Sequence, residues 1–160
     1  MTRTALLSLL LVLTFLGLAD SWYLAQTALD GASLACSIDG LESLNGCNQV
    51  AQSAYSKVMG VPLALYGVFF YGVLFVIASV LFAMPWRVLY RASIVLGVIG
   101  MLLSLYFVFL QFFVIKALCI YCMASMVISI LIFFVTLRLW NQFAVVRVVE
   151  PVTPVIPLVS

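Results

Sequence analysis

The feature that most constrains this chain is its set of long apolar segments with almost no charge. Charged residues make up 8% of the sequence and hydrophobic residues 67%, whereas a soluble domain needs about three times as many charges. A helix needs about 20 apolar residues to cross roughly 30 Å of hydrocarbon. We therefore predict an all-α integral membrane protein, a four-transmembrane-helix bundle with spans at about 5–29, 62–83, 88–110 and 117–139.

The first apolar segment has two interpretations. Gly17 and Ala19 are small residues at which a signal peptidase could cut, so a cleavable signal peptide is one of them. Apolar residues continue past that point to about Leu29, and Trp22 and Tyr23 are of the type found at membrane interfaces. We favour an uncleaved span.

The only long polar segment covers residues 30–61 and must lie outside the hydrocarbon. It contains two of the four cysteines, Cys36 and Cys47. Helical spacing predicts a short helix in this loop, with Asn45 as its N-cap and Cys47 in its first turn. The positions that share one face of that helix are Cys47, Val50, Ala51, Ala54 and Val58.

Basic residues near the span ends predict the orientation. Cytoplasmic loops are enriched in Lys and Arg, so both termini and the turn at Pro85 are expected in the cytoplasm, with the polar loop outside. Gln111 to Lys116 is expected to form a turn at the outer face, and residues 141–160, with three prolines, a loose cytoplasmic tail. The side with more basic residues has Arg3, Arg87, Arg91, Arg138 and Arg147, and the other has Lys57 and Lys116.

This topology brings all four cysteines to the outer membrane face. Cys119 and Cys122 form a C-x-x-C motif in the first turns of the fourth span, a pair that can cycle between dithiol and disulfide, bind a metal or simply be buried. Lys116 and the start of the helix should favour the ionised form of Cys119. Cys122 lies one turn deeper, where a lipid-soluble two-electron acceptor such as a quinone can reach it.

Two other roles for the cysteines remain open at this point. The protein could be a non-catalytic membrane subunit whose loop is held by a structural disulfide, or by a zinc ion on four thiolates. We favour two pairs that exchange disulfides and no metal site. The chain has no histidine, the commonest metal ligand, and no basic stripe that would indicate nucleic-acid binding.

The order of the motifs resembles the vitamin K epoxide reductase (VKOR) family, over roughly residues 5–140. The resemblance is to the bacterial branch without a fused thioredoxin-like domain. It rests on an upstream Cys36, then C-x-x-V-x-x-S from Cys47 to Ser53, then Gly60-Val61-Pro62 and the late C-x-x-C motif. DsbB-like quinone reductases, the nearest alternative among enzymes, have an early C-x-x-C motif instead.

The resemblance implies a membrane thiol-disulfide oxidoreductase in a bacterial inner membrane. It would oxidise an extracytoplasmic thioredoxin-fold (DsbA-like) partner and pass the electrons to a quinone of the ubiquinone, menaquinone or vitamin K type. Cys36 would exchange with the partner, Cys47 with Cys119, and Cys122 would reduce the quinone, which Ser53 would help to orient.

The sequence offers several candidates for the groups that would bind the quinone ring. Met126 stands where animal members of the family have a tyrosine. The aromatic candidates for the pocket, which could equally be packing residues, are Tyr66, Tyr71, Tyr106 and Tyr121.

Overall fold

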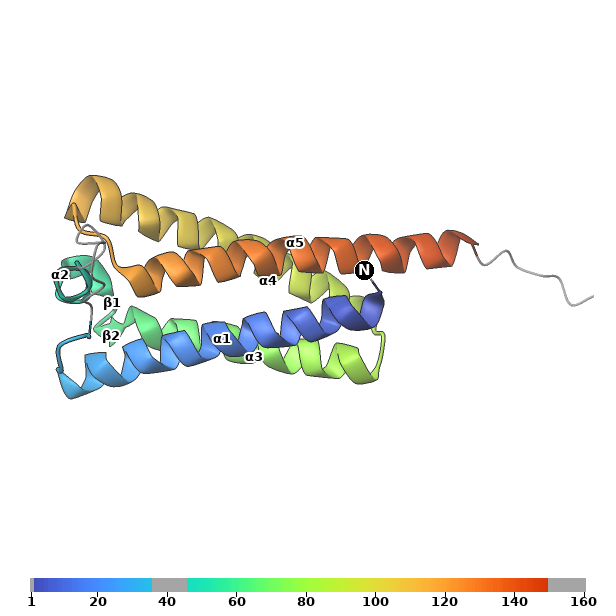
Figure 1. Ribbon diagram of the computed structural model, residues 1–160, viewed down its shortest axis with the longest axis horizontal. Coiled ribbons are helices and arrows are strands. Elements are labelled where there is room, and N and C mark those ends of the chain that lie inside the picture. Colours follow the sequence, from blue (N-terminus) through green and yellow to red (C-terminus); the bar gives the residue numbers. More distant parts are fainter. Residues whose placement is uncertain (1, 36–45, 150–160) are drawn as a thin grey trace, which may run out of the picture.

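Four long helices form the molecule in this computed structural model, which describes residues 2–35 and 46–149 and side chains as far as residue 142. Each contains a segment long and apolar enough to cross a membrane. The predicted all-α, four-helix membrane bundle is therefore confirmed. The helices, shown in Figure 1, are α1 (Arg3–Asp30), α3 (Leu63–Ala83), α4 (Arg87–Phe109) and α5 (Ile120–Val149).

The short elements gather at one end of the bundle, opposite the N-terminus (Figure 1). The two strands form an antiparallel hairpin in which Val58 pairs with Val61. Its two-residue turn, Met59-Gly60, has positive φ at both positions, as a tight hairpin of this type requires. These elements are α2 (Cys47–Ala51), η2 (Ala54–Ser56), β1 (Lys57–Val58) and β2 (Val61–Pro62).

The loop helix is shorter than predicted. Cys47 does lie in its first turn, but α2 ends at Ala51 instead of continuing to Val58, and its N-cap is Gly46 instead of Asn45, which lies outside the described residues. The reason for the early end is Ser53, whose N–H and hydroxyl both donate to the Val50 carbonyl at 3.1 and 2.7 Å. Such local side-chain bonds compete with helix continuation.

The turn predicted at Gln111 to Lys116 is wrong, because α4 continues directly into a π-helix, η3 (Leu110–Ile115). No proline or glycine interrupts residues 110–115. The helix ends at Lys116, which has left-handed backbone angles (φ 54°), and the Gln111 carbonyl accepts from the N–H groups of both Lys116 and Ala117. Consequently α5 begins at Ile120, and Cys119 precedes the helix instead of lying in its first turn.

The fourth helix also ends later than predicted. α5 extends to Val149, so the predicted loose tail does not begin at residue 141. No glycine or proline occurs between residues 120 and 149, and without such a breaker an apolar helix continues. Residues 150–160 lie outside the described part of the chain.

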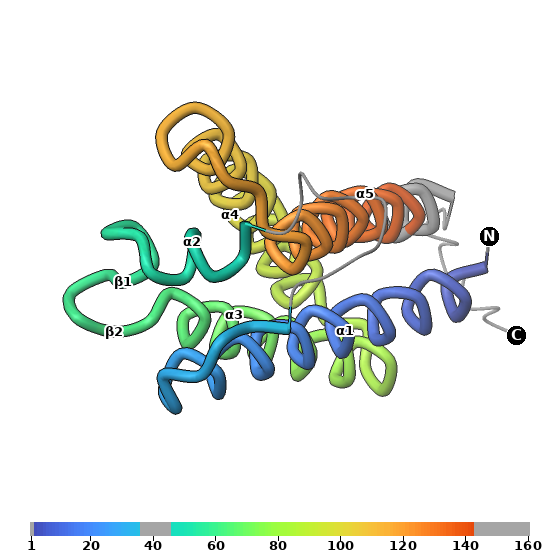
Figure 2. The backbone as a smooth tube through the Cα atoms, turned by 60° about the vertical axis from the view of Figure 1, so that its left-hand side comes forward, coloured from blue at the N-terminus to red at the C-terminus, as the bar shows by residue number. Residues whose placement is uncertain are grey.

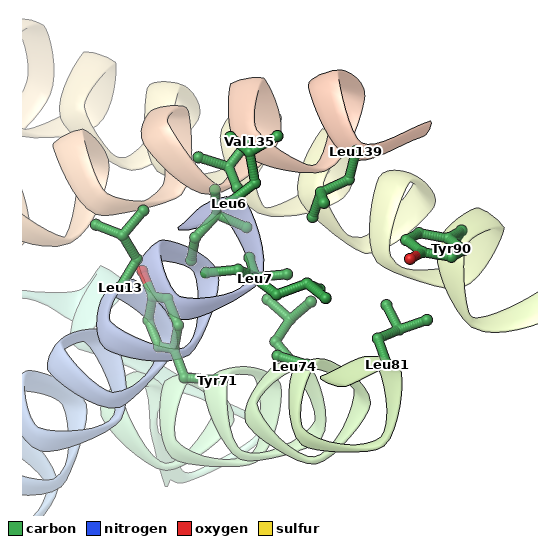
Figure 3. Close-up of a cluster of buried hydrophobic side chains, with 12 residues drawn as sticks. Leu6, Leu7, Leu13, Tyr71, Leu74, Leu81, Tyr90, Val135 and Leu139 are labelled. Atoms are coloured by element: carbon green, nitrogen blue, oxygen red, sulfur yellow. The ribbon is translucent and has the colours of Figure 1, made fainter. Parts of the chain in front are cut away.

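The hydrophobic core occupies the half of the bundle away from α2. Arg3 ties that end together, because its guanidinium donates to the Tyr90 hydroxyl at 3.1 Å and to the Leu81 carbonyl at 3.0 Å. Figure 3 shows core side chains of the four helices pointing toward one another. The buried set is Leu6, Leu7, Leu10, Leu13, Tyr71, Leu74, Ala78, Leu81, Tyr90, Ile132, Val135 and Leu139.

Small residues let the helices pack closely inside the membrane, where the hydrophobic effect does not drive their association. Gly17 of α1 faces the ring of Tyr71, and a Cβ at Gly97 of α4 would lie 3.2 Å from the Thr136 hydroxyl of α5. Toward the end that carries α2, however, α4 and α5 diverge (Figures 1 and 2). The bundle is thus packed at one end and splayed at the other.

Candidate functional site

A cavity of about 680 Å³ lies inside the splayed half of the bundle. Ligand pockets in proteins have volumes of about 300–1,000 Å³, so a small ring-shaped ligand fits this space. The wall is mostly apolar, and every long helix and the loop contribute to it. Its cysteine, polar and ionisable members are Asp20, Ser21, Thr27, Cys47, Asn48, Gln52, Ser53, Ser56, Lys57, Tyr66, Tyr71, Ser104, Cys119, Cys122, Ser125 and Ser129.

Three of the four cysteines lie on this wall. Cys119 and Cys122 are free thiols, of which the first is buried and the second half-buried. Cys47 is completely buried and disulfide-bonded, and it packs in one cluster with Cys119 and Leu34. Cys36 lies outside the described residues, so its role stays a prediction.

A main-chain hydrogen bond joins the polar loop to the segment that directly precedes the C-x-x-C motif. The Gly46 N–H donates to the Leu118 carbonyl at 3.0 Å, and these are the residues immediately before Cys47 and Cys119. A Cβ at Gly46 would lie only 2.7 Å from the Cβ of Ala117. The absence of a side chain at this position therefore lets the two segments approach, which holds Cys47 near Cys119.

Cys119 occupies the N-cap position of α5. Its carbonyl accepts the Met123 N–H at 3.1 Å. The pKa of Cys119 is lowered to about 7, mainly because the Cys122 side chain donates a hydrogen bond to its sulfur, with burial acting against the shift and the N–H groups of Cys122 and Tyr121 adding to it. The direction agrees with the prediction, although Lys116 is not among the causes. A large fraction of Cys119 is thus the nucleophilic thiolate at neutral pH.

Gln111 supports the C-x-x-C motif, and sequence reasoning missed it. Its side chain is 2% exposed, and its Oε1 accepts the Cys119 N–H at 3.0 Å. The same amide also hydrogen-bonds Cys122. The available signal was a lone amide at the end of an apolar span, since polar groups at membrane depth usually have a specific partner.

Two further side chains hold the start of the polar loop. The Asn48 amide forms a pair of bonds with the backbone of Leu34, accepting its N–H at 2.7 Å and donating to its carbonyl at 3.3 Å. The Tyr121 hydroxyl donates to the Ala35 carbonyl at 2.9 Å, and its ring lies 5.3 Å from that of Tyr23. Residues 34–35 are therefore attached to both α2 and α5.

A network of hydroxyl groups forms the deeper wall of the cavity. The Tyr71 hydroxyl lies 2.9 Å from the hydroxyls of Ser125 and Ser129, and Ser104 donates to Ser129 at 3.1 Å. Tyr71 thus belongs to both the hydrophobic core and the cavity wall. The network joins α3, α4 and α5 within the membrane-spanning part of the molecule.

The remaining candidates from the sequence have different positions. Ser53 lines the cavity, and its hydroxyl donates to the Val50 carbonyl. Tyr66 is on the wall, whereas Tyr106 is 53% exposed and contacts Phe107. Among the described residues, Ser125 and Ser129 line the wall on this part of α5 and Met126 does not.

Comparison with protein-family models identifies a match. The family model for the vitamin K epoxide reductase family matches residues 8–137. No curated protein matches the chain. The matched region runs from α1 into α5 and includes all four cysteines.

Proposed function

Because the chain belongs to the vitamin K epoxide reductase family, we propose that it is a quinone-dependent oxidase of protein thiols. Membership places it among membrane thiol-disulfide oxidoreductases. The observation that carries the finer proposal is the position of two free thiols, Cys119 and Cys122, on the wall of the bundle cavity. A lipid-soluble quinone can enter such a cavity, whereas a folded protein cannot.

The electrons enter the proposed relay at the polar loop. A thioredoxin-fold protein outside the cytoplasm gives two electrons to the pair Cys36/Cys47 and is left with a disulfide, which supports disulfide formation in secreted proteins. Thiol-disulfide exchange requires a thiolate to reach a disulfide sulfur. Cys47 packs in one cluster with Cys119, which supports exchange between these two residues.

The electrons leave the relay at the C-x-x-C motif. Cys122 is the thiol proposed to react with the quinone, and Cys119 is its resolving partner. When their disulfide forms, the two electrons reduce the quinone to the quinol. A resolving thiol attacks as the thiolate, and the lowered pKa of Cys119, about 7, favours that form.

The quinone would lie among the polar groups of the cavity wall. Quinone carbonyls accept hydrogen bonds, so hydroxyl groups such as that of Tyr71 suit them. Ser53 is proposed to contact the ring from the loop side. Its hydroxyl hydrogen is engaged with Val50, so in this arrangement its oxygen accepts a hydrogen bond from the quinol more readily than it donates one to the quinone.

The proposed location is the inner membrane of a bacterium, with both termini in the cytoplasm. Five arginines near the span ends of one side, against two lysines on the other, support this orientation. The loop end would then face an oxidising compartment, which is where disulfides persist.

Quinone reduction in lipid nanodiscs tests the proposal. With a small dithiol as reductant, the wild-type protein should reduce a short-chain quinone, followed by quinone absorbance. Cys122→Ser and Cys119→Ser should abolish the reaction, because neither can form the disulfide that releases two electrons. Cys47→Ser should lose activity with a thioredoxin-fold donor and keep activity with the small dithiol.

A matched control is Ser79→Ala, which changes an exposed residue of α3 and should retain the wild-type rate. Full activity in Cys122→Ser would contradict the proposal. Metal analysis addresses the non-catalytic alternative, because stoichiometric zinc that a chelator removes, together with no quinone reduction, would favour a structural zinc site.

A further inference from the structure

Asp20 is a carboxyl group in the membrane-spanning helix α1 that the relay proposed above does not use. Its side chain lies on the wall of the same cavity as Cys119 and Cys122. Its Oδ2 atom is buried and has no hydrogen-bond partner among the described residues. Ionisable groups inside membrane spans are costly, and those that occur usually have a function.

The groups that face Asp20 come from the elements packed against α1. On α1 itself Tyr23 lies one turn further along, and its ring contacts Tyr121. Strand β2, which also contacts α1, consists of Val61 and Pro62 and brings no titratable group. Asp20 also interacts electrostatically with titratable groups of two other segments. These are Tyr71 on α3, and Cys119, Tyr121 and Cys122 at the N-terminal end of α5.

None of these neighbours is a cation that would pair with a carboxylate. Lys57 is the one basic residue on the described cavity wall, and it lies in the exposed hairpin. Because an unpaired charge within the membrane is unfavourable, this site suits a carboxyl group that carries its proton. The cavity also connects Asp20 with that exposed hairpin, which gives the group a route to water.

The proton balance of quinone reduction requires a second proton donor, and such a carboxyl group could supply that proton. Forming a quinol takes two electrons and two protons. The dithiol supplies both electrons, but with the pKa of Cys119 near 7, a large share of the pairs at neutral pH carries only the proton of Cys122. In those molecules the second proton must come from another group.

We propose that Asp20 donates the second proton to the quinone, an assignment that rests on the proposed function. In this step the Cys119 thiolate, the Cys122 thiol, the quinone and the Asp20 acid become the Cys119–Cys122 disulfide, the quinol and the Asp20 carboxylate. Two electrons pass from the two sulfurs to the quinone. One proton comes from Cys122 and one from Asp20, which then regains its proton from water at the loop end.

The test compares Asp20→Asn with the wild type in nanodiscs, using a small dithiol and a short-chain quinone between pH 5.5 and 7.5. We expect kcat of the variant to fall about fourfold at pH 7.5, because with the pKa of Cys119 at about 7 only about a quarter of the pairs then carry both protons, while KM changes less than about twofold. The defect should shrink toward pH 5.5, where the dithiol carries both protons. A purely structural role would not produce that pH dependence.

Two variants on the same helix serve as controls. Asp30→Asn alters the exposed carboxyl at the end of α1 and should retain the wild-type rate at every pH. Asp20→Glu keeps the acid and should restore most of the activity. Wild-type kinetics in Asp20→Asn across the pH range would overturn the assignment, whereas loss of quinone reduction in the wild type itself would refute the proposed function instead.

Infrared spectroscopy provides a readout that does not depend on the folding of a variant. In the wild type, a single turnover should transiently decrease the C=O stretching band of a protonated carboxyl group, between the loss of the Asp20 proton and its return from water. The band change should be absent from Asp20→Asn. An unchanged carboxyl band in the wild type during turnover would also overturn the assignment.

Discussion

At the scale of the residue, the two cysteines of the C-x-x-C motif differ in environment although they are three positions apart. Cys119 precedes α5 and receives hydrogen bonds from the helix N–H groups and from Cys122. Cys122 is inside the first turn of the helix and bonds to Gln111. The hydrogen bond from Cys122, together with the N–H groups at the helix start, therefore makes Cys119 the thiolate of the pair.

Thiolate absorbance in the ultraviolet should reveal this difference. With the Cys47 disulfide intact, thiolate should appear as the pH rises through about 7, below the usual cysteine value of about 8.5. Because the pKa is lowered in the folded protein, the thiolate's contribution to stability is present at higher pH and lost as the pH falls through about 7.

Cys122→Ala removes the main donor to the Cys119 sulfur, so the midpoint should move up toward the usual value. Cys119→Ser should remove the thiolate transition near pH 7 altogether. An unchanged midpoint in Cys122→Ala would contradict the assigned cause of the shift.

At the scale of the element, the π-helix η3 explains how Gln111 reaches the site. A π-turn accommodates one more residue than an α-turn and is often found at functional sites. Here the Gln111 carbonyl closes the helix end, while its side chain holds the Cys119 N–H. One residue thus connects the end of the third span to the start of the fourth.

Gln111→Leu should lower both the stability and the rate of quinone reduction. It leaves the buried Cys119 N–H without its acceptor, which costs about 1–3 kcal/mol, and it releases Cys122. Thermal unfolding in detergent and the nanodisc assay measure the two effects. Phe112→Leu, at the neighbouring residue that is 62% exposed, should change neither, and wild-type behaviour of Gln111→Leu in both assays would refute the supporting role.

At the scale of the whole molecule, one half of the bundle holds the packed core and the other half holds the cavity. The hydrophobic core and the bonds of Arg3 close one end, so the other end can splay around a cavity without losing the fold. The three cysteines that the structure describes and the hairpin belong to the splayed end. The proposed function requires that this end face outward.

Cysteine labelling tests that orientation. In a variant without native cysteines, Met59→Cys and Trp86→Cys place thiols at opposite ends of the bundle, at residues that are 95% and 59% exposed. A membrane-impermeant maleimide added to intact spheroplasts should label Met59→Cys at once and Trp86→Cys only after permeabilisation. The reverse pattern would invert the proposed topology.

Some features of this protein could be predicted from the sequence because they depend on neighbours along the chain. Apolar length predicted the four helices, and the order of the cysteine motifs indicated the family before the comparison showed it. The errors fell at helix ends. Ser53 ended α2 early, and η3 continued where a turn was expected, because hydrogen bonds decided those ends and hydropathy does not record them.

The tertiary structure alone decided what surrounds the cysteines. The bond from Cys119 to Gln111, that from Tyr121 to Ala35 and the network around Tyr71 join residues that are far apart in the sequence or on different helices. No local pattern encodes such pairs. Hydropathy and spacing determined that the chain crosses the membrane and carries a C-x-x-C motif, and helix packing determined which polar groups meet that motif.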